Sequence, residues 1–582
     1  MIKKLLSSVR EYKKPTLLTF LFIIGEVIIE CMIPFLTASL VNQMKGDMDL
    51  KTLLLTGLLL VAMALVSLGC GGVAGYTSAQ AAAGFAKNLR NDIFDRIQGY
   101  SFENIDKFSS SSLVTRLTTD VSNVQMAYMM SIRTAVRSPL MLVFSIIMAY
   151  RMGGTLAATF LVIIPVLAIG LFVISRLAMP AFHRVFKKYD KLNESIEENV
   201  RAMRVVKGFA REEYEKKKFG HAAEEIRSNF VKAERIVAFN NPLMQACLYF
   251  NMIFVLTVGS KLVITSMGST LDVGHISAML TYSMQILMSL MMLSMIYVML
   301  TMSLESMKRI AEVLDEESTL KNPEHPVMEV KDGSIDFKDV SFKYSEKAQK
   351  YSLFDVDLHI ESGMTVGIIG GTGSSKSSLV QLIPRLYDAT KGTVMVGGVD
   401  VKDYDIETLR DSVAMVLQKN QLFSGTIKEN LRWGHADATD EELIHACKLA
   451  QADDFVSSFP DGYDTYIEQG GTNVSGGQKQ RLCIARALLK KPKILILDDS
   501  TSAVDTRTDA MIRKGFKDFI PDTTKIIIAQ RISSVEEADL IIVMDNGKIS
   551  AAGNHKELMA SCDIYQEIYE QQTSGKAGEE NE

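Results

Sequence analysis

The C-terminal half contains the glycine- and serine-rich run Gly370-Gly371-Thr372-Gly373-Ser374-Ser375-Lys376-Ser377-Ser378. It follows the apolar run Met364–Ile369, which predicts a buried strand, and it precedes a segment of helical composition. A glycine-rich turn between a strand and a helix presents backbone N–H groups to phosphate oxygens. In that arrangement Lys376 reaches the β- and γ-phosphates, and the Ser377 hydroxyl binds Mg²⁺. The stretch therefore predicts a phosphate-binding loop with one departure, because Ser375 stands where the motif has glycine.

A second motif supports this interpretation, because the loop alone could be an ordinary Gly/Ser-rich turn. Lys493–Asp499 is an apolar strand that ends in two carboxylates, Asp498 and Asp499. Asp498 is placed to hold Mg²⁺ directly or through water. Just before this strand stands Asn473-Val474-Ser475-Gly476-Gly477-Gln478-Lys479-Gln480-Arg481.

The run Val474–Gln478 resembles the LSGGQ signature of the ABC ATPases, and its place some twenty residues before the second acidic motif is specific to that family. Other matches follow in the family's order: Tyr344 for adenine stacking, Gln418 as the Q-loop glutamine, and Ser502-Ala503-Val504-Asp505 as the D-loop. The resemblance covers nearly the whole chain and implies ATP and Mg²⁺ as cofactors.

The resemblance also assigns roles to residues of this chain. Catalytic roles fall to Lys376, Gln418, Ser475, Gly476, Gly477, Gln478, Asp498, Asp499 and Gln530. Nucleotide contacts fall to Tyr344, Gln418 and the whole loop from Gly370 to Ser378. Mg²⁺ ligation falls to Ser377, Gln418 and Asp498.

Two departures from the family pattern fall at positions to which the family assigns roles in ATP hydrolysis. Members that hydrolyse ATP well have glutamate after the Mg²⁺ aspartate, whereas this chain has Asp499. The shorter side chain retracts the carboxylate by about 1.5 Å, and a misplacement of about 1 Å can cost about a hundredfold in rate. The family's switch histidine is replaced by Gln530, which can donate a hydrogen bond but cannot carry charge. We expect a hydrolytically weak site, the alternative being neutral drift with activity retained.

The intact signature has a separate consequence. In ABC dimers each ATP lies between the phosphate loop of one subunit and the signature of the other. This chain therefore resembles the degenerate-site subunit of heterodimeric bacterial exporters, whose signature completes the active site of the partner. The resemblance implies a second half-transporter that supplies the catalytic glutamate and the switch histidine.

The N-terminal half has the composition of a membrane domain. The chain is 47% hydrophobic and 23% charged, which fits a membrane part joined to a soluble part. Six segments reach the length of about 20 apolar residues that a bilayer requires. They run near 16–40, 52–77, 134–150, 155–177, 243–265 and 275–303.

Basic residues predict the orientation of these spans. The N-terminus and the two long connections are rich in lysine and arginine, which places them in the cytoplasm. Both long connections, Ala81–Asn123 and Met179–Asn240, read as helices that continue out of the membrane. By position, the coupling helices of ABC exporters correspond to Ser101–Phe108 and Arg204–Arg211.

The expected architecture is a multi-domain membrane protein: a six-helix all-α transmembrane domain with long cytoplasmic extensions, followed by an α/β P-loop ABC ATPase domain. The expected boundaries are 1–314 for the transmembrane domain, 315–332 for a linker, 333–572 for the ATPase domain and 573–582 for a disordered tail. The net charge of −5 argues against nucleic acid as the main partner.

Two features of the predicted spans have both a functional and a packing interpretation. Glu26 and Glu30 lie one helical turn apart and form either a site for a cationic substrate or, as we favour, a wetted helix face. The sixth span carries many methionines, which suit varied ligands but more often pack. They are Met279, Met284, Met288, Met291, Met292, Met295 and Met299.

The predicted function is ATP-driven export of an amphipathic drug, lipid or peptide across a bacterial cell membrane, with the N-terminus and the ATPase domain in the cytoplasm. Two alternatives remain open. One is uptake by the same fold, and the other is a regulatory or channel-like subunit that binds ATP and barely hydrolyses it.

Overall fold

The computed structural model describes residues 1–44, 50–265, 271–345, 348–499 and 504–579. The chain forms two compact units. The helical unit comprises Met1–Gln98 and Ser109–Glu316, and the α/β unit comprises Gly99–Phe108 and Glu317–Glu582. The α/β unit therefore includes ten residues from the middle of the N-terminal half.

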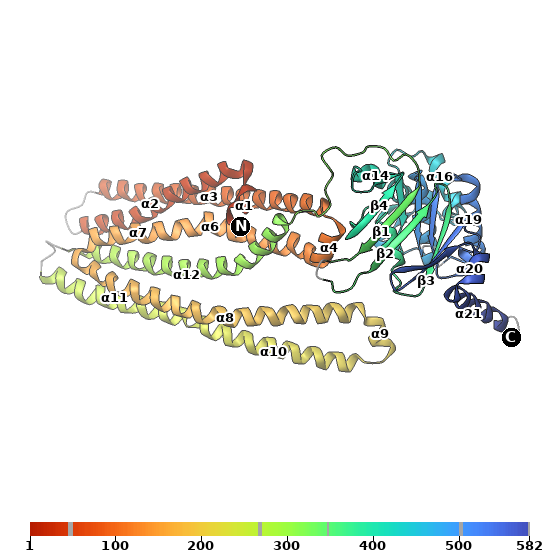
Figure 1. Ribbon diagram of the computed structural model, residues 1–582. Helices are drawn as coiled ribbons and strands as arrows, with labels where there is room; N and C mark the ends of the chain where they lie inside the picture. Colours follow the sequence, from red (N-terminus) through yellow and green to blue (C-terminus); the bar gives the residue numbers. More distant parts are fainter. Residues whose placement is uncertain (45–49, 266–270, 346–347, 500–503, 580–582) are drawn as a thin grey trace. The chain divides into compact units, whose positions relative to one another are not determined.

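Long apolar helices dominate the helical unit (Figure 1). The main ones are α2 (Lys13–Gln43), α3 (Leu50–Gln98), α7 (Thr134–Gly153), α8 (Phe160–Arg201), α11 (Asn240–Thr265) and α12 (Val273–Asp315). Within the described residues, five helical stretches are long and apolar enough to cross a membrane. One of them, Ser110–Phe182, contains α7 and the start of α8, which the 3-10 turn η3 (Gly154–Thr159) separates. Each of the six predicted spans thus falls on one of these helices, the fourth beginning in η3.

Shorter helices complete this unit. They are α1 (Ile2–Ser7), the 3-10 turn η1 (Arg10–Tyr12), α5 (Ser110–Thr115), the π-helical turn η2 (Arg116–Asp120), α6 (Val121–Ile132), α9 (Met203–Gly208) and α10 (Glu212–Ala238). Helix α9 connects the packed pair α8 and α10, at the position predicted for the second coupling helix.

The side chains of the helical unit are arranged as in a protein solvated by lipid. Leucines of α3 such as Leu54, Leu58 and Leu68 are exposed on its surface, although burial in a protein core would be expected in water. A helix satisfies its own backbone hydrogen bonds, so an apolar exterior is compatible with the bilayer. Between helices the packing is ordinary: Ile23, Val27 and Cys31 of α2 are buried in one cluster. Ala74 of α3 and Met141 of α7 complete that cluster.

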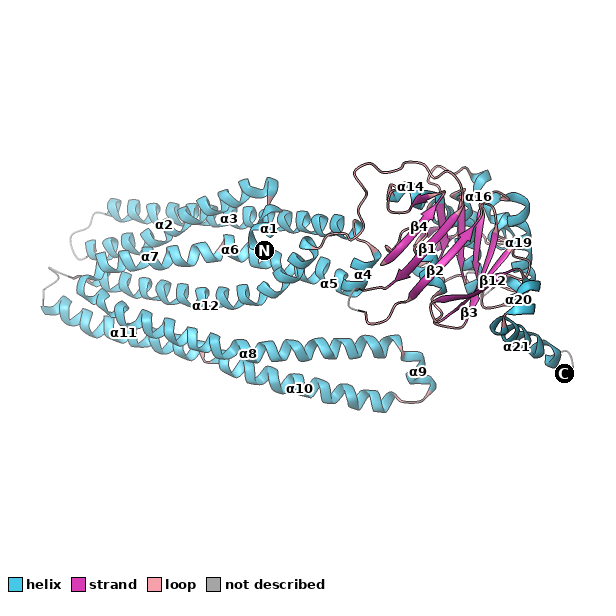
Figure 2. Cartoon of the chain, viewed as in Figure 1, coloured by secondary structure: helices cyan, strands magenta, loops and turns pink. Residues whose placement is uncertain are grey.

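The α/β unit contains two larger sheets and a two-stranded ribbon (Figure 2). The six-stranded sheet has the order β12-β11-β3-β10-β9-β6, in which all neighbours are parallel except β11 and β12. Its strands are β3 (Thr365–Gly370), β6 (Val413–Val416), β9 (Ile494–Asp498), β10 (Thr524–Ile528), β11 (Leu540–Asp545) and β12 (Lys548–Gly553). Its central strands β9 and β10 are buried along their whole length and carry isoleucine or leucine at most positions, as expected for a sheet covered on both faces.

The second sheet is antiparallel, with the order β2-β1-β4-β5. Its strands are β1 (Ile335–Phe342), β2 (Leu353–Ile360), β4 (Lys391–Val396) and β5 (Val399–Asp400), and the ribbon is β7 (Gly425–Thr426) with β8 (Tyr466–Ile467). The α-helices of this unit are α4 (Phe102–Phe108), α13 (Lys376–Gln381), α14 (Ile406–Ser412), α15 (Ile427–Arg432), α16 (Asp440–Leu449), α17 (Asp453–Ser457), α18 (Gly476–Leu489), α19 (Thr506–Phe519), α20 (His555–Ser561) and α21 (Asp563–Glu579). Its 3-10 turns are η4 (Gly462–Asp464), η5 (Gln469–Gly471) and η6 (Ile532–Ser534).

The C-terminus differs from the sequence prediction of a disordered tail over 573–582. Helix α21 continues through this segment to Glu579, while residues 580–582 lie outside the described part of the chain. Helix α12 ends at Asp315 and β1 begins at Ile335, and the linker over 315–332 stays a prediction.

Candidate functional site

The phosphate loop lies between β3 and α13, at the carboxyl end of the parallel sheet where ligands of open α/β folds bind. The backbone of Gly370 and Gly373 has φ angles of 153° and 84°. A β-carbon on Gly370 would lie 2.1 Å from the carbonyl oxygen of Met544, so only glycine fits there. Ser375, at the position where the motif has glycine, is left-handed with φ 71° and ψ 27°. The serine thus occupies a glycine conformation, at a cost of about 1–2 kcal/mol.

Lys376 is directed into the loop that precedes it. Its Nζ donates to the carbonyl oxygens of Gly370 and Gly371 at 2.8 and 2.9 Å, and it lies 3.3 Å from the Ser374 hydroxyl. Burial lowers the pKa of Lys376, because it disfavours the charged ammonium. A polyphosphate in this loop would offer Nζ charged acceptors, which make stronger hydrogen bonds than carbonyl groups.

Two candidate Mg²⁺ ligands meet beside the loop. The Ser377 hydroxyl donates to Oδ1 of Asp498 at 3.0 Å. Asp498 ends β9 and is buried, and this burial raises the pKa of its carboxyl group. A hydroxyl and a carboxylate are the hard oxygen donors that Mg²⁺ takes alongside phosphate oxygens. These residues therefore fit a Mg–ATP complex, in which the metal would neutralise charge on the phosphates.

Two further predicted site residues, Gln530 and Gln418, lie at the carboxylate of a third, Asp499. Its Oδ2 accepts a hydrogen bond from Nε2 of Gln530 at 2.8 Å, and Nε2 of Gln418 lies 3.4 Å away. The three side chains follow β9, β10 and β6, so the parallel sheet brings together residues that are far apart in the sequence. A cavity of about 130 Å³ beside them is lined in part by Asp499, Gln530 and the buried Asp509.

Tyr344 lies next to the loop helix and is 40% exposed. Its hydroxyl is 2.8 Å from that of Ser378 and donates to Oε1 of Gln381 at 3.1 Å. The ring packs edge-on against Phe342 and Tyr387, with centroid distances of 4.8 and 5.2 Å. This arrangement leaves part of the ring free for a base, in keeping with the predicted stacking role.

The signature residues form the beginning of α18. Ser475 is the N-cap: its Oγ accepts from the N–H of Gln478 at 3.3 Å, while its own N–H donates to Oε1 of Gln478 at 2.9 Å. Ser475 and Gly476 are exposed and Gly477 is partly exposed, so this turn presents N–H groups on the surface of the α/β unit. Of the predicted D-loop, Ser502 and Ala503 lie outside the described residues, and Asp505 caps α19.

The membrane half contains an ion-pair cluster that sequence reasoning missed. Nη2 of Arg137 on α7 lies 2.6 Å from Oε2 of Glu30, and its Nε lies 3.3 Å from Oε1 of Glu26. Because the guanidinium bridges both carboxylates, the pair on α2 is neither a bare cation site nor simply a wetted face. A basic residue inside the predicted span 134–150 was the available signal, since intramembrane charges usually pair.

The methionines of α12 and a group of surface aspartates are two other candidates for binding roles. Of the methionines on α12, Met279 is fully buried, whereas Met284, Met288, Met292 and Met295 are exposed.

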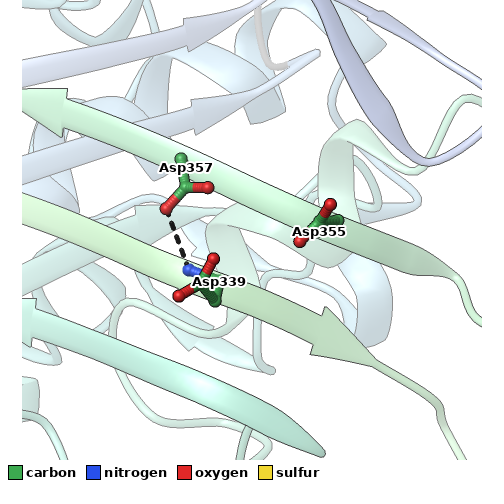
Figure 3. A group of neighbouring side chains, drawn as sticks. All are labelled: Asp339, Asp355 and Asp357. Atoms are coloured by element: carbon green, nitrogen blue, oxygen red, sulfur yellow. Dashed lines mark hydrogen bonds between the residues drawn. The ribbon is translucent and has the colours of Figure 1, made fainter.

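Outside the site, the carboxylates of Asp339, Asp355 and Asp357 lie within 4.8 Å of one another on β1 and β2 (Figure 3). The N–H of Asp339 donates to Asp357 at 2.9 Å. All three are exposed, and we assign no ligand to them.

Comparison with known proteins identifies the class of molecule that these features define. Residues 16–290 match the model of the ABC transporter transmembrane region, and residues 353–502 match that of the ABC transporter. The chain is 35% identical over 580 residues to the uncharacterized ABC transporter ATP-binding protein YfiB of Bacillus subtilis, covering 100% of both chains. The chain therefore belongs to the ABC transporter family.

Two further similarities concern a relative of this chain and a solved structure. The chain is 32% identical over 480 residues to a fatty acid ABC transporter ATP-binding/permease protein of Mycobacterium tuberculosis, covering 82% of this chain and 75% of the relative. The solved structure of a bacterial Atm1-family ABC exporter with ATP bound superposes with a TM-score of 0.83 at 23% identity. That match covers 97% of this chain and 98% of the other, and it establishes the ABC exporter fold.

Proposed function

We propose that this chain is the degenerate-site subunit of a heterodimeric, ATP-driven exporter in a bacterial cell membrane, with its N-terminus and ATPase domain in the cytoplasm. The proposal rests on one observation. Asp499 and Gln530 stand where hydrolytically active family members have the catalytic glutamate and the switch histidine, while the signature of this chain is intact. Gln530 donates to the Asp499 carboxylate at 2.8 Å, so the short acid is held by a neutral amide rather than by a histidine.

Each part of the composite machinery has a separate role. Lys376, the loop N–H groups and Tyr344 bind ATP, while Ser377, Gln418 and Asp498 hold Mg²⁺. The partner, a second half-transporter with catalytic glutamate and switch histidine, performs most hydrolysis. Ser475–Gln478 of this chain close over the ATP that the partner binds.

The proposed cargo is an amphipathic drug, lipid or peptide. The apolar exterior of the helices, the exposed methionines of α12 and the fatty acid transporter among the relatives support this class. Uptake by the same fold remains the second candidate for direction.

The test compares the chain alone with the complex. Purified alone, the chain should bind ATP but hydrolyse it slowly, because any homodimer carries Asp499 and Gln530 at both sites. Co-expressed with a half-transporter that carries the catalytic glutamate and the switch histidine, it should show ATPase activity and ATP-dependent accumulation of an amphipathic dye in inside-out vesicles. Rapid hydrolysis by the isolated chain would contradict the degenerate-site assignment. Accumulation in right-side-out vesicles supplied internally with ATP would indicate uptake instead.

A further inference from the structure

One face of the C-terminal helix α21 is fixed to the core of the α/β unit. Tyr565 on this face is fully buried, and Ile568 and Tyr569 pack against a hydrophobic cluster that also contains Ile532 of η6. Residues three, four and seven positions apart share one face of a helix. The docking of α21 therefore brings the side chain of Gln572 to the switch segment, residues 530–536, which follows β10.

The start of α20 makes a second contact with the switch segment. Nδ1 of His555 lies 2.8 Å from the hydroxyl oxygen of Tyr565, and its Nε2 lies 3.5 Å from Oε1 of Glu536. The rings of His555 and Tyr569 are 5.5 Å apart, measured between their centroids. Helices α20 and α21 thus pack together and hold the far end of the switch segment through Glu536.

Gln572 binds the backbone of the switch segment on both sides of Arg531. Its Nε2 donates to the carbonyl oxygen of Gln530 at 2.8 Å, and its Oε1 accepts from the N–H of Ile532 at 2.9 Å. Arg531 between them is extended, with φ −101° and ψ 127°. One side-chain amide therefore satisfies a backbone acceptor and a backbone donor, as a neighbouring strand would.

The backbone that Gln572 holds carries a side chain of the nucleotide site. Nε2 of Gln530 donates to Oδ2 of Asp499 at 2.8 Å. This nitrogen bears two N–H groups, so Gln530 can hold Asp499 and donate to a γ-phosphate oxygen at the same time. Both hydrogen bonds require a defined position of the Gln530 backbone, because the side chain extends from it.

We propose that Gln572 is a positioning residue that fixes the backbone of Gln530 and so directs its side chain at the γ-phosphate. The inference rests on the proposed function, in which Gln530 stands in for the switch histidine beside the ATP that this chain binds. Without Gln572 the switch segment takes more than one position, and the apparent affinity for ATP falls by the fraction of molecules in the competent one. ADP lacks the γ-phosphate, so its affinity does not depend on Gln572.

The test measures the affinities of the full-length chain in detergent for ATP and for ADP, each with Mg²⁺. Gln572→Met keeps the length of the side chain and removes both hydrogen bonds to the switch segment. We expect about three- to tenfold weaker affinity for ATP, the range that corresponds to loss of about one hydrogen bond. The affinity for ADP should not change measurably.

A double variant tests whether Gln572 acts through Gln530. Gln530→Ala alone should weaken the binding of ATP relative to that of ADP, because it removes the proposed donor to the γ-phosphate. In this background Gln572→Met should cause no further loss, since residues that act through one contact are not additive.

Gln571→Met is the matched control, because it makes the same substitution at the next residue of the same helix. Gln571 is exposed, and its Nε2 donates to Oε1 of Glu567 within α21 at 3.2 Å. This variant should leave both affinities unchanged. A variant that was merely unstable would lose ATP and ADP binding together, so the ratio of the two affinities reports the position of Gln530 and not the stability of the fold.

The possible outcomes discriminate between the inference and the proposed function. Unchanged ATP affinity in Gln572→Met, an equal loss for ADP, an equal loss in Gln571→Met, or a further loss in the double variant would overturn the inference. If Gln530→Ala does not weaken ATP binding relative to ADP, the proposed role of Gln530 fails. If Gln530→Ala weakens it and Gln572→Met does not, only the positioning by Gln572 fails.

Discussion

Among single residues, Ser375 shows the clearest conflict between a side chain and its backbone, because its φ of 71° lies in the left-handed region. Glycine would remove a strain of about 1–2 kcal/mol there. The greater conformational freedom of glycine in the unfolded chain would cancel about 0.5–1 kcal/mol of that gain. Ser375→Gly should therefore stabilise the protein by about 0.5–1 kcal/mol. Thermal unfolding in detergent measures this change.

A matched control for this substitution is Ser458→Gly, because Ser458 has an ordinary φ of −78°. At that position glycine relieves no strain, adds freedom to the unfolded chain, and removes the hydrogen bond from the Ser458 hydroxyl to the carbonyl oxygen of Phe455, so the variant should be less stable. If the two glycine variants changed the unfolding temperature equally, the left-handed conformation of Ser375 would not be a source of strain.

Replacing both Asp499 and Gln530 by the residues that the family has there should increase ATP hydrolysis. Asp499→Glu extends the carboxylate by about 1.5 Å, and Gln530→His supplies a side chain that can carry charge. The double variant should raise ATP turnover by the isolated chain at least about tenfold, since placement errors of this size cost about a hundredfold. Steady-state phosphate release measures the turnover.

Adding Ser377→Ala to the double variant should abolish the gain, because the Ser377 hydroxyl is a proposed Mg²⁺ ligand. If the double variant gained nothing, the limiting defect would lie elsewhere in the site, and Ser375 would be the next residue to restore.

At the scale of secondary-structure elements, Arg137 connects α7 to two carboxylates of α2. Arg137→Ala would leave Glu26 and Glu30 one turn apart without this guanidinium, so the two negative charges would repel each other. Removal of one partner from a fully buried pair costs about 3–5 kcal/mol, and partial exposure of these side chains reduces the expected loss to about 1–3 kcal/mol. The unfolding temperature in detergent should fall.

Arg151→Ala is the comparison for this loss, because Arg151 is an exposed arginine in the last turn of the same helix. It should leave the unfolding temperature nearly unchanged. A similar decrease in both variants would mean that the ion pairs between α2 and α7 contribute no stability of their own.

The sequence predicted elements whose signals are local. Two local patterns each specify a strand and the turn that follows it. One is the glycine-rich segment after Met364–Ile369, and the other is the pair of carboxylates after Lys493–Leu497. The structure has a strand at each place, β3 and β9. Apolar length alone likewise indicated the long helices of the N-terminal half. The convergence of Gln418, Asp499 and Gln530 was available only from the family resemblance, since nothing in their local sequences sets the order of the strands.

Contacts between distant segments were beyond the sequence. Arg137 and Glu30 are 107 residues apart, and Tyr387 and Asp106 are 281 apart. Periodicity predicts which face of a helix is apolar but not which helix that face meets. The position of α4 is of this kind: the family resemblance assigns a short helix there by position, while its contacts with Tyr387 and residues 317–319 join segments that are far apart in the sequence.

At the scale of the whole molecule, the proposed heterodimer predicts that the two motifs of this chain serve different ATP sites. Ser475 and Gly477 should face the ATP held by the partner, whereas Asp499 faces the ATP held by this chain. Ser475→Arg places bulk and charge where the competent site must close, and it should abolish most ATPase activity and transport of the complex. Asp499→Asn should cost far less, because its site contributes little chemistry. Both rates are measured on the reconstituted complex.

Ser475→Arg also removes the N-cap of α18, which by itself costs about 1 kcal/mol of stability. Thr439→Arg is the matched control, since Thr439 is an exposed N-cap with the same reciprocal capping box on α16. That variant should lose a similar cap energy and keep ATPase activity, which isolates the effect of closing the partner's site. Equal losses from Ser475→Arg and Asp499→Asn would mean that both sites hydrolyse ATP alike, and the asymmetric mechanism would then have to be abandoned.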